Sequence, residues 1–524
     1  MALDLDDHRD GSGWVVRVSL PEPSLKDNTA DADRLCRCLQ QELGMDQVHI
    51  GLDLSRRLPA LLRQSHYAVR CLVFEDRPHH GVLIHLDAGD SPAAVTGLAV
   101  DLGTTRVVIR LVDLENRKTL AETSFDNPQV NVGPDVLARI HHTDRPSGLE
   151  DLQGQIIDAL NAQLEALCGA CSLSTDNVHL FSVAGNTAMS HLFAGLPAHW
   201  MIREPYIPAA NRFPLMHAHA LGLCAGGNAR VWLFPNVGSY FGGDLIAGLL
   251  FSGLHQRSET ALLVDVGTNA EVVLGNSDWL MACAGAAGPA LEGGMSRMGT
   301  TAAPGVIDRV RIDAQTGHFE LHTIGELPPV GICGSGVIDL AAQLFLSGMI
   351  DIRGKLQAGP CGERFAIKND LAHLILVSRE QSGTGRDLCI SQVDLDSLVR
   401  SKAAMYTILE TLTGTMGMDL ADLETFYVAG TFGSLIDPVS AITIGMIPDL
   451  PLERFQSLGN SSLGGATKVL TERGAVSEAA RVREKITYLE LNVNQDFMNR
   501  FSAAKFIPHT HKGRFPSVNL LKQS

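Results

Sequence analysis

The sequence predicts a mixed α/β protein that contains two similar lobes. The first observation is a strand, a tight glycine turn and a second strand that occur twice, as GLAVDLGTTRVVIRL at 97–111 and ALLVDVGTNAEVVLG at 261–275. The second observation is a strand that ends in Ala-Gly before a helix, once at 184–185 and again at 429–430. Because both segments recur in the same order, we expect one lobe to be a duplicate of the other.

Composition limits the classes of protein to consider. The chain has 524 residues, too many for one hydrophobic core, and a formal net charge of −16, which argues against nucleic acid or an anionic membrane as a partner. The sequence contains no apolar run long enough to span a bilayer and begins with an acidic stretch rather than a secretory signal. Its ten cysteines are scattered, as is typical of reduced thiols. We therefore expect a cytoplasmic protein.

The remaining patterns divide the chain into five parts. We expect residues 1–12 to be disordered, and residues 13–94, with strand-like runs around one clear helix, to form a small α/β domain. The first lobe is expected at 95–255 and the second at 256–508, including a closing helix. The basic segment 509–524 lacks periodicity and is expected to be a tail.

The repeated turn has the chemistry of a phosphate site. Glycine permits a sharp turn and a close ligand, and consecutive backbone N–H groups in such a turn attract an anion. Threonine and asparagine side chains add donors in both copies: Thr104, Thr105, Thr268 and Asn269, beside Gly103 and Gly267. Asp101 and Asp265 end the entering strands, and a carboxylate there suits a Mg²⁺ ion rather than the phosphate itself.

Glycine turns are common in unrelated β-hairpins, so one copy alone would be weak evidence. The two copies, however, share Val-Asp, one apolar residue and then Gly-Thr, and both continue into strand residues. This match favours duplication. We expect the two lobes to face each other across a cleft, with a polyphosphate between the two turns.

The motifs resemble the ATPase core shared by acetate and sugar kinases, heat-shock chaperones and actin. The resemblance rests on Asp101-Leu-Gly-Thr-Thr105, Asp265-Val-Gly-Thr-Asn269 and Ala429-Gly-Thr-Phe-Gly433, in that order. It implies duplicated ribonuclease-H-like lobes, an actin-like core that binds ATP and Mg²⁺. It also implies that Gly430, Thr431 and Gly433 hold the adenosine.

The chain is more specifically similar to the reductive activators of corrinoid-dependent methyltransferases. Six further motifs carry this resemblance: NPQ at 127–129, GNTAM.H at 185–191, AGPALEGG at 287–294, GICGSGVID at 331–339, GN...GGA at 459–466 and YLEL at 488–491. The resemblance implies ATP-driven reduction of cob(II)alamin to cob(I)alamin on a corrinoid protein. Glu292, in a loop of small residues, is a candidate for positioning the attacking water, with a helix-capping role as an equal alternative.

The cysteine pattern departs from that family. Typical members begin with a plant-type [2Fe–2S] domain, which C-x4-C-x2-C and a later cysteine identify, and this sequence contains no such run. Its single C-x2-C pair, Cys168 and Cys171, ends a predicted helix, where packing is a better interpretation than redox chemistry. We therefore expect no intrinsic [2Fe–2S] cluster and an external electron donor, a ferredoxin or flavoprotein.

Three other functions remain open at this stage. A non-reductive ATP-binding partner or chaperone of a corrinoid protein is the strongest, since the iron–sulfur motif is missing. A small-molecule kinase would need a catalytic acid at a substrate hydroxyl, and the sequence has no recognisable sugar-kinase motif. An actin-like filament protein would fit the acidic surface and the extra small domain poorly. The oligomeric state is also open, with a homodimer as one alternative.

Overall fold

The computed structural model describes residues 13–239, 241–267, 270–285, 298–300, 302–313, 316–430, 436–489 and 495–521. The segment 1–12, expected to be disordered, lies outside these ranges. The chain forms two compact units. The first unit comprises Asp4–Gly253 and Ser461–Lys485, and the second mainly Leu254–Asn460 and Ile486–Ser524. None of the helices in the described ranges is both long and apolar enough to cross a bilayer.

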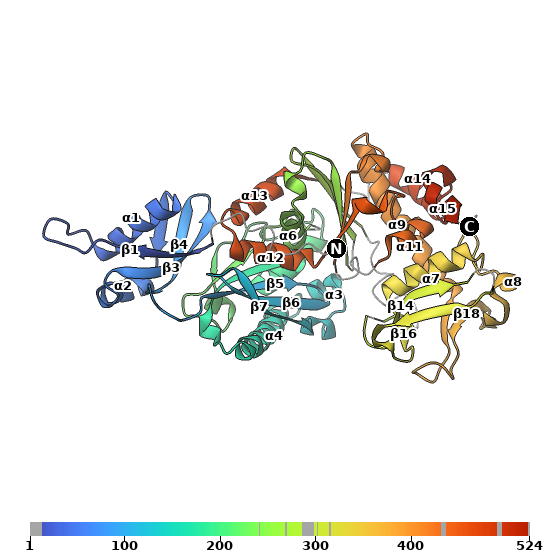
Figure 1. Ribbon diagram of the computed structural model, residues 1–524, viewed down its shortest axis with the longest axis horizontal. Coiled ribbons are helices and arrows are strands. Elements are labelled where there is room, and N and C mark those ends of the chain that lie inside the picture. Colours follow the sequence, from blue (N-terminus) through green and yellow to red (C-terminus); the bar gives the residue numbers. More distant parts are fainter. Residues whose placement is uncertain are drawn as a thin grey trace. The chain divides into compact units, whose positions relative to one another are not determined.

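The first unit begins with a small α/β domain. Its antiparallel and parallel strands follow the order β1-β3-β4-β2: β1 (Val15–Ser19), β3 (Ala68–Arg77), β4 (His80–Ala88) and β2 (Gln47–Ile50). Two helices, α1 (Asp31–Leu43) and α2 (Leu52–Gln64), pack against this sheet (Figure 1). The helix α2 buries three leucines spaced four residues apart, Leu54, Leu58 and Leu62, so its amphipathic pattern serves packing.

The rest of the first unit is a lobe around a six-stranded sheet of order β7-β6-β5-β8-β10-β9. Its strands are β5 (Thr96–Leu102), β6 (Arg106–Asp113), β7 (Lys118–Asp126), β8 (Val178–Gly185), β9 (Met216–His217) and β10 (Arg230–Leu233). Its helices are α3 (Val136–His142), α4 (Gly148–Ala170), α5 (Thr187–Ala194), α6 (Gly243–Ser252), α12 (Ser461–Thr471) and α13 (Ala475–Lys485).

The second unit contains a matching sheet of order β21-β20-β11-β12-β13-β22. Its strands are β11 (Ala261–Val266), β12 (Ala270–Gly275), β13 (Leu280–Gly285), β20 (Thr425–Ala429), β21 (Phe455–Gly459) and β22 (Ile486–Tyr488). Around it lie α7 (Gly334–Leu346), α8 (Ala358–Cys361), α9 (Gln392–Thr415), α11 (Pro438–Ile444), α14 (Gln495–Ala504) and α15 (Pro516–Leu521). Two small sheets complete the unit: β14 (Val306–Ile312), β15 (Phe319–Thr323) and β16 (Gly331–Ile332), and β17 (Phe365–Lys368), β18 (Leu371–Val377) and β19 (Leu388–Ser391).

The two large sheets share the connectivity of five strands and differ in the sixth, because β9 pairs with β10 in the first sheet and β22 pairs with β13 in the second. In each, the first three strands are antiparallel neighbours, β5-β6-β7 and β11-β12-β13. In each, the first strand is also parallel to the fourth, and the fourth is parallel to one later strand, as β5-β8-β10 and β11-β20-β21. This repetition confirms the predicted duplicated ribonuclease-H-like lobes, and the sheet β1-β3-β4-β2 with α1 and α2 confirms the small α/β domain before them.

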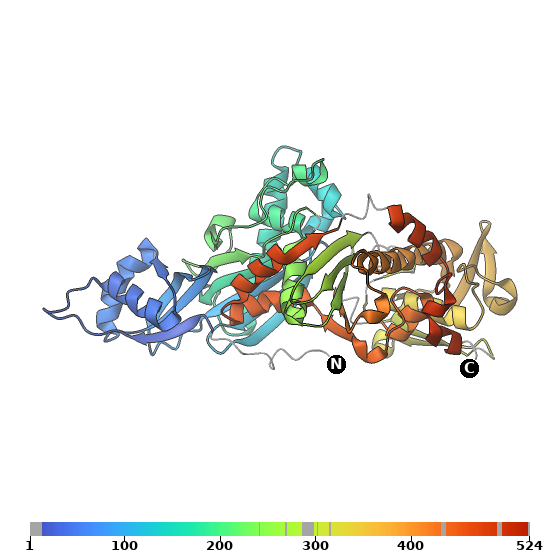
Figure 2. The same ribbon diagram turned by 90° about the horizontal axis from the view of Figure 1, so that it is seen from above.

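The late helices α12 and α13 pack in the first unit, although they lie far along the chain. We expected residues 256–508 to form the second lobe with a closing helix, and Ser461–Lys485 is the stretch that packs with the earlier residues. Helix α12 lies against α6 and β5, and Figure 2 shows these late helices, in red, beside the green and blue elements of that lobe. The close approach uses Gly465, where a Cβ would stand 2.1 Å from the carbonyl oxygen of Ala247.

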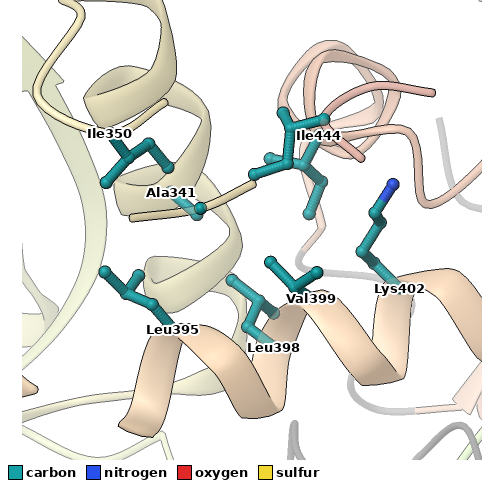
Figure 3. A pocket seen from close by; sticks show the side chains of 9 residues that line it. Ala341, Ile350, Leu395, Leu398, Val399, Lys402 and Ile444 are labelled. Carbon is teal, nitrogen blue, oxygen red and sulfur yellow. The ribbon is translucent and has the colours of Figure 1, made fainter. Parts of the chain in front are cut away.

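The chain end is more ordered than its sequence suggests. We expected a tail at 509–524, but residues 516–521 form α15, and Phe515 and Val518 are buried in the core of the second unit. The Lys402 ammonium of α9 donates to the carbonyl oxygens of Phe506 (2.5 Å) and Pro508 (2.7 Å), and burial lowers its pKa well below the usual value. Its stem lies beside Val399 at a small apolar cavity (Figure 3). The apolar partners of Phe515 come from distant helices, so local periodicity gives no sign of them.

Candidate nucleotide site

The turn after β5 carries the first predicted phosphate site. Asp101 pairs with Ala184 of the neighbouring parallel strand β8, and Leu102 pairs with Gly185. Gly103 follows, and a Cβ there would stand 2.2 Å from the carbonyl oxygen of Arg106, so only glycine fits. The structure thus brings together the Asp turn and the later Ala-Gly turn, which lie far apart in the sequence.

Three side-chain and backbone contacts hold this turn. Asn186, which caps α5, donates from Nδ2 to Oγ1 of Thr104 (3.0 Å). Asn127 donates from Nδ2 to the carbonyl oxygen of Gly103 (2.9 Å), and its backbone N–H donates to the carbonyl oxygen of Thr105 (2.8 Å). The turn is therefore fixed before any ligand binds, which lowers the entropic cost of binding.

Two further polar groups accompany Asp101 in the first unit. Ser462, at the start of α12, donates to Oδ1 of Asp101 (2.8 Å). Asp244, in the first turn of α6, interacts electrostatically with Asp101. Desolvation of its carboxyl, together with the negative charge of Asp101, raises the pKa of Asp244 to about 7, although the residue as a whole is only partly buried.

The turn after β11 repeats the arrangement in the second unit. Asp265 pairs with Ala429 of the parallel strand β20, just as Asp101 pairs with Ala184. Gly430 has a φ of +88°, and a Cβ there would stand 2.9 Å from Oδ1 of Asp265 and 2.7 Å from the carbonyl oxygen of Val266. A side chain at 430 would therefore collide with the carboxylate, which explains the glycine of this turn.

Several predicted residues lie outside the described ranges: Thr268, Asn269, Glu292, Thr431 and Gly433. Gly267 is described and directly follows β11. A mainly apolar cavity of about 190 Å³ lies within the second unit. It is lined on one side by strand residues such as Val266 and Val428 and on another by Ile436 and Pro438.

The donors around Asp101 suit a hard cation. Carboxylate and hydroxyl oxygens are what Mg²⁺ prefers, and this ion ordinarily keeps several waters and binds through one or two carboxylates plus substrate phosphates. Within the described residues, no group of three or more histidine, cysteine, aspartate or glutamate side chains could form an all-protein metal site. The residues of the turn thus fit a magnesium ion that arrives with a nucleotide.

The C-x2-C pair has the environment of packed thiols. Cys168 is buried, and burial together with the neighbouring Cys171 raises its pKa. A reactive or metal-binding thiol needs the opposite shift, because the thiolate is the reacting form. This supports the packing interpretation of the pair.

Sequence reasoning did not assign roles to four of the residues at the turn: Asn127, Asn186, Asp244 and Ser462. Three of them lie in motifs that carried the family resemblance, NPQ, GNTAM.H and GN...GGA. Asp244 offered another signal, an acidic residue in the first turn of an otherwise apolar helix. Their convergence on Asp101 and the turn that follows it depends on chain segments that are far apart in sequence.

Family models cover almost the whole chain. The RACo linker region matches residues 10–93, the RACo middle region 96–257, and the C-terminal domain of RACo, the ASKHA domain, 259–519. The chain belongs to the RACo family. This confirms the predicted resemblance to reductive activators of corrinoid proteins.

A solved structure and two curated proteins are similar to this RACo-family chain. The structure, a reductive activator for corrinoid, iron–sulfur protein, is 37% identical with a TM-score of 0.87, over 99% of this chain and 82% of that chain. The corrinoid activation enzyme RamQ of Eubacterium limosum is 29% identical, over 80% of this chain and 72% of that protein. The [Co(II) methylated amine-specific corrinoid protein] reductase of Methanosarcina barkeri is 26% identical, over 77% and 75%.

Proposed function

We propose that this protein uses Mg²⁺-ATP to activate a corrinoid protein reductively, from cob(II)alamin to cob(I)alamin, with the electron supplied by a separate donor. The observation that carries the proposal is the pair of equivalent Asp turns, Asp101 beside Ala184–Gly185 and Asp265 beside Ala429–Gly430, in a chain of the RACo family. The names of its relatives, which all refer to corrinoid activation or a corrinoid protein, support a corrinoid protein as the substrate.

In this proposal the turn residues bind ATP. The backbone amides and hydroxyls of Gly103–Thr105 and Gly267–Asn269 bind phosphate oxygens, and Asp101 and Asp265 hold the magnesium ion or its waters. Gly430, Thr431 and Gly433 bind the adenosine, and the second unit also holds the apolar cavity that Val428 and Ile436 line. Magnesium neutralises phosphate charge when bound, and Glu292 orients the attacking water.

Asp244 extends this proposed site. Its carboxyl interacts with Asp101, and it lies on a helix rather than a loop, so its position is rigid. We assign the Asp244 carboxyl to binding the magnesium ion, or a water molecule, beside the phosphates. Ser462 has a supporting role there, because its hydroxyl fixes the orientation of the Asp101 carboxylate.

ATP is needed because cobalt reduction is energetically unfavourable. For a one-electron step, each 59 mV or so of unfavourable potential costs about 1.4 kcal/mol. Binding to the corrinoid protein can offset this only by favouring a more reducible cobalt environment, and ATP hydrolysis can then release the partner by changing affinity. The donor is proposed to be a ferredoxin or flavoprotein.

The decisive experiment follows the cobalt spectrum of a corrinoid protein held as cob(II)alamin. Titanium(III) citrate serves as reductant, with and without this protein and Mg²⁺-ATP. We expect cob(I)alamin only when both are present, and none with Asp101→Asn. The matched control is Asp158→Asn, on the exposed face of α4, which should retain activity.

Other outcomes separate the alternative functions. ATP-dependent binding to the corrinoid protein without cobalt reduction would indicate a non-reductive partner or chaperone. ATP consumption with phosphorylation of a small alcohol and no corrinoid interaction would indicate a kinase. Either result would contradict the proposed reduction.

A further inference from the structure

A fully buried arginine lies beneath the phosphate turn of the first unit. Arg139, on α3, has no exposed surface, and its guanidinium reaches four groups from three parts of the chain. Nε donates to the carbonyl oxygen of Gly133 (2.9 Å), and Nη1 contacts Oε1 of Gln129 (3.2 Å) and Sδ of Met189 (3.3 Å). Nη2 donates to the carbonyl oxygen of Thr104, in the turn itself (2.7 Å).

None of these contacts neutralises the charge of Arg139. All four acceptors are uncharged, and no ion pair joins Arg139 to a carboxylate within the described ranges. Burial lowers the pKa of Arg139 to about 10, while the exposed carboxylate of Asp135 acts in the opposite direction, so the guanidinium is positive at neutral pH. A buried cation ordinarily has an anionic partner, since an uncompensated charge is costly to desolvate.

The contacts also set the direction of the turn's peptide groups. Three successive carbonyl oxygens of the turn accept hydrogen bonds from the protein. Asn127 donates to the carbonyl oxygens of Gly103 and Thr105, and Arg139 donates to that of Thr104. In a trans peptide the N–H of the next residue points the opposite way. The N–H groups of Thr104 and Thr105 therefore point away from these donors, and neither donates to a protein acceptor within the described part of the chain.

We infer that Arg139 is a positioning residue for the nucleotide phosphates: it fixes the Thr104 carbonyl inward so that the turn amides face the phosphate, whose negative charge adds to that of Asp135 in offsetting the buried guanidinium. This inference rests on the proposed function, because it assumes that the Asp101 turn binds ATP. It adds a role that acts through the turn, since the guanidinium contacts the carbonyl oxygen of Thr104.

The test measures nucleotide binding by four proteins: wild type, Arg139→Gln, Arg139→Lys and Arg230→Gln. Arg230 is the matched control, because it is also a buried arginine of the first unit and bonds instead to His217 and the carbonyl oxygen of Asn228. Titration calorimetry gives the affinity for Mg²⁺-ATP, and displacement of a fluorescent nucleotide gives the affinity for adenosine, which lacks phosphate. Thermal unfolding checks that each variant is folded.

We expect Arg139→Gln to weaken Mg²⁺-ATP binding by at least about tenfold, the usual effect of losing a charged hydrogen bond, and adenosine binding by much less. Arg139→Lys keeps the positive charge but has a single nitrogen in place of the three of the planar guanidinium. Its affinity for Mg²⁺-ATP should therefore lie between those of Arg139→Gln and wild type. Arg230→Gln should bind ATP as wild type does. A merely structural role would weaken ATP and adenosine binding equally.

Three results would overturn the inference. The first is wild-type ATP affinity in either Arg139 variant, and the second is an equal loss of ATP and adenosine binding. The third is an Arg139→Gln variant that loses no more ATP affinity than Arg230→Gln. If Arg139→Gln does not fold, the comparison of Arg139→Lys with Arg230→Gln decides. Failure of the wild type to bind Mg²⁺-ATP is a different result, because it overturns the proposed function as well.

Discussion

At the scale of single residues, His179 shows how burial affects a titratable group at the junction of the small domain and its lobe. Its ring stacks on His85 of β4 with centroids 3.9 Å apart, and it is only 7% exposed. Burial, reinforced by the adjacent His85 and Arg70, lowers the pKa of His179 to about 3, while Asp87 acts in the opposite direction.

This pKa shift predicts a loss of stability in mild acid. Below pH 6.5 the unfolded chain protonates His179, but the folded chain does not until about pH 3, so stability decreases as pH falls through this window. Between pH 7 and pH 5 the loss from this group is about 2 kcal/mol. Urea denaturation of wild type and His179→Phe should show the difference, because phenylalanine keeps a ring on His85 but binds no proton.

The control for this prediction is His49→Phe. His49 lies on β2 of the same domain and is exposed, so its replacement should leave the pH dependence as in wild type. Equal pH dependence in wild type and His179→Phe would contradict the prediction.

At the scale of elements, the contact between α6 and α12 is as close as glycine permits. A Cβ at Gly465 would stand 2.1 Å from the carbonyl oxygen of Ala247, and backbone atoms cannot yield as a flexible side chain can. The contact also has a functional consequence, because α12 carries Ser462 to Asp101 and α6 carries Asp244. The spacing of these two helices therefore sets the surroundings of the Asp101 carboxylate.

We predict that Gly465→Ala destabilises the first unit by about 1–3 kcal/mol, the usual cost of overpacking. It should also weaken Mg²⁺-ATP binding, because α12 must move away from α6. Gly154→Ala is the matched control: Gly154 is inside α4, and a Cβ there would meet no atom within 4 Å, so alanine should stabilise by about 0.5–1 kcal/mol. Denaturant unfolding and calorimetry measure both effects, and a Gly465→Ala variant as stable as wild type would show that the helices can separate at no cost.

At the scale of the whole molecule, duplication leads to a prediction about stoichiometry. Two equivalent turns could bind two nucleotides or contribute to one. Because the proposed adenosine residues follow β20 alone, we predict one ATP per chain, and we expect Asp101→Asn and Asp265→Asn each to abolish binding. Calorimetry with Asp158→Asn as control measures this. Two ATP per chain, with one retained in each single variant, would contradict the prediction.

The fold and much of the candidate site could be predicted from the sequence because they depend on local and repeated patterns. The apolar runs that enter the two turns and the glycines after Asp101 and Asp265 identify both hairpins, and their recurrence predicts the duplicated lobes that the strand orders confirm. The residue types also indicate the chemistry, since glycine, threonine and aspartate in this order suit phosphate and magnesium.

Only the tertiary structure shows which distant residues complete the first turn. Ser462 contacts Asp101 because α12 packs on α6, and Arg139 reaches Thr104 because α3 lies below the turn. Phe515 and Val518 near the chain end are likewise buried through contacts with distant parts of the chain. Each of these depends on contacts between segments far apart in sequence, and such contacts leave no local periodicity, because the free energy that favours them comes from burial in the assembled core.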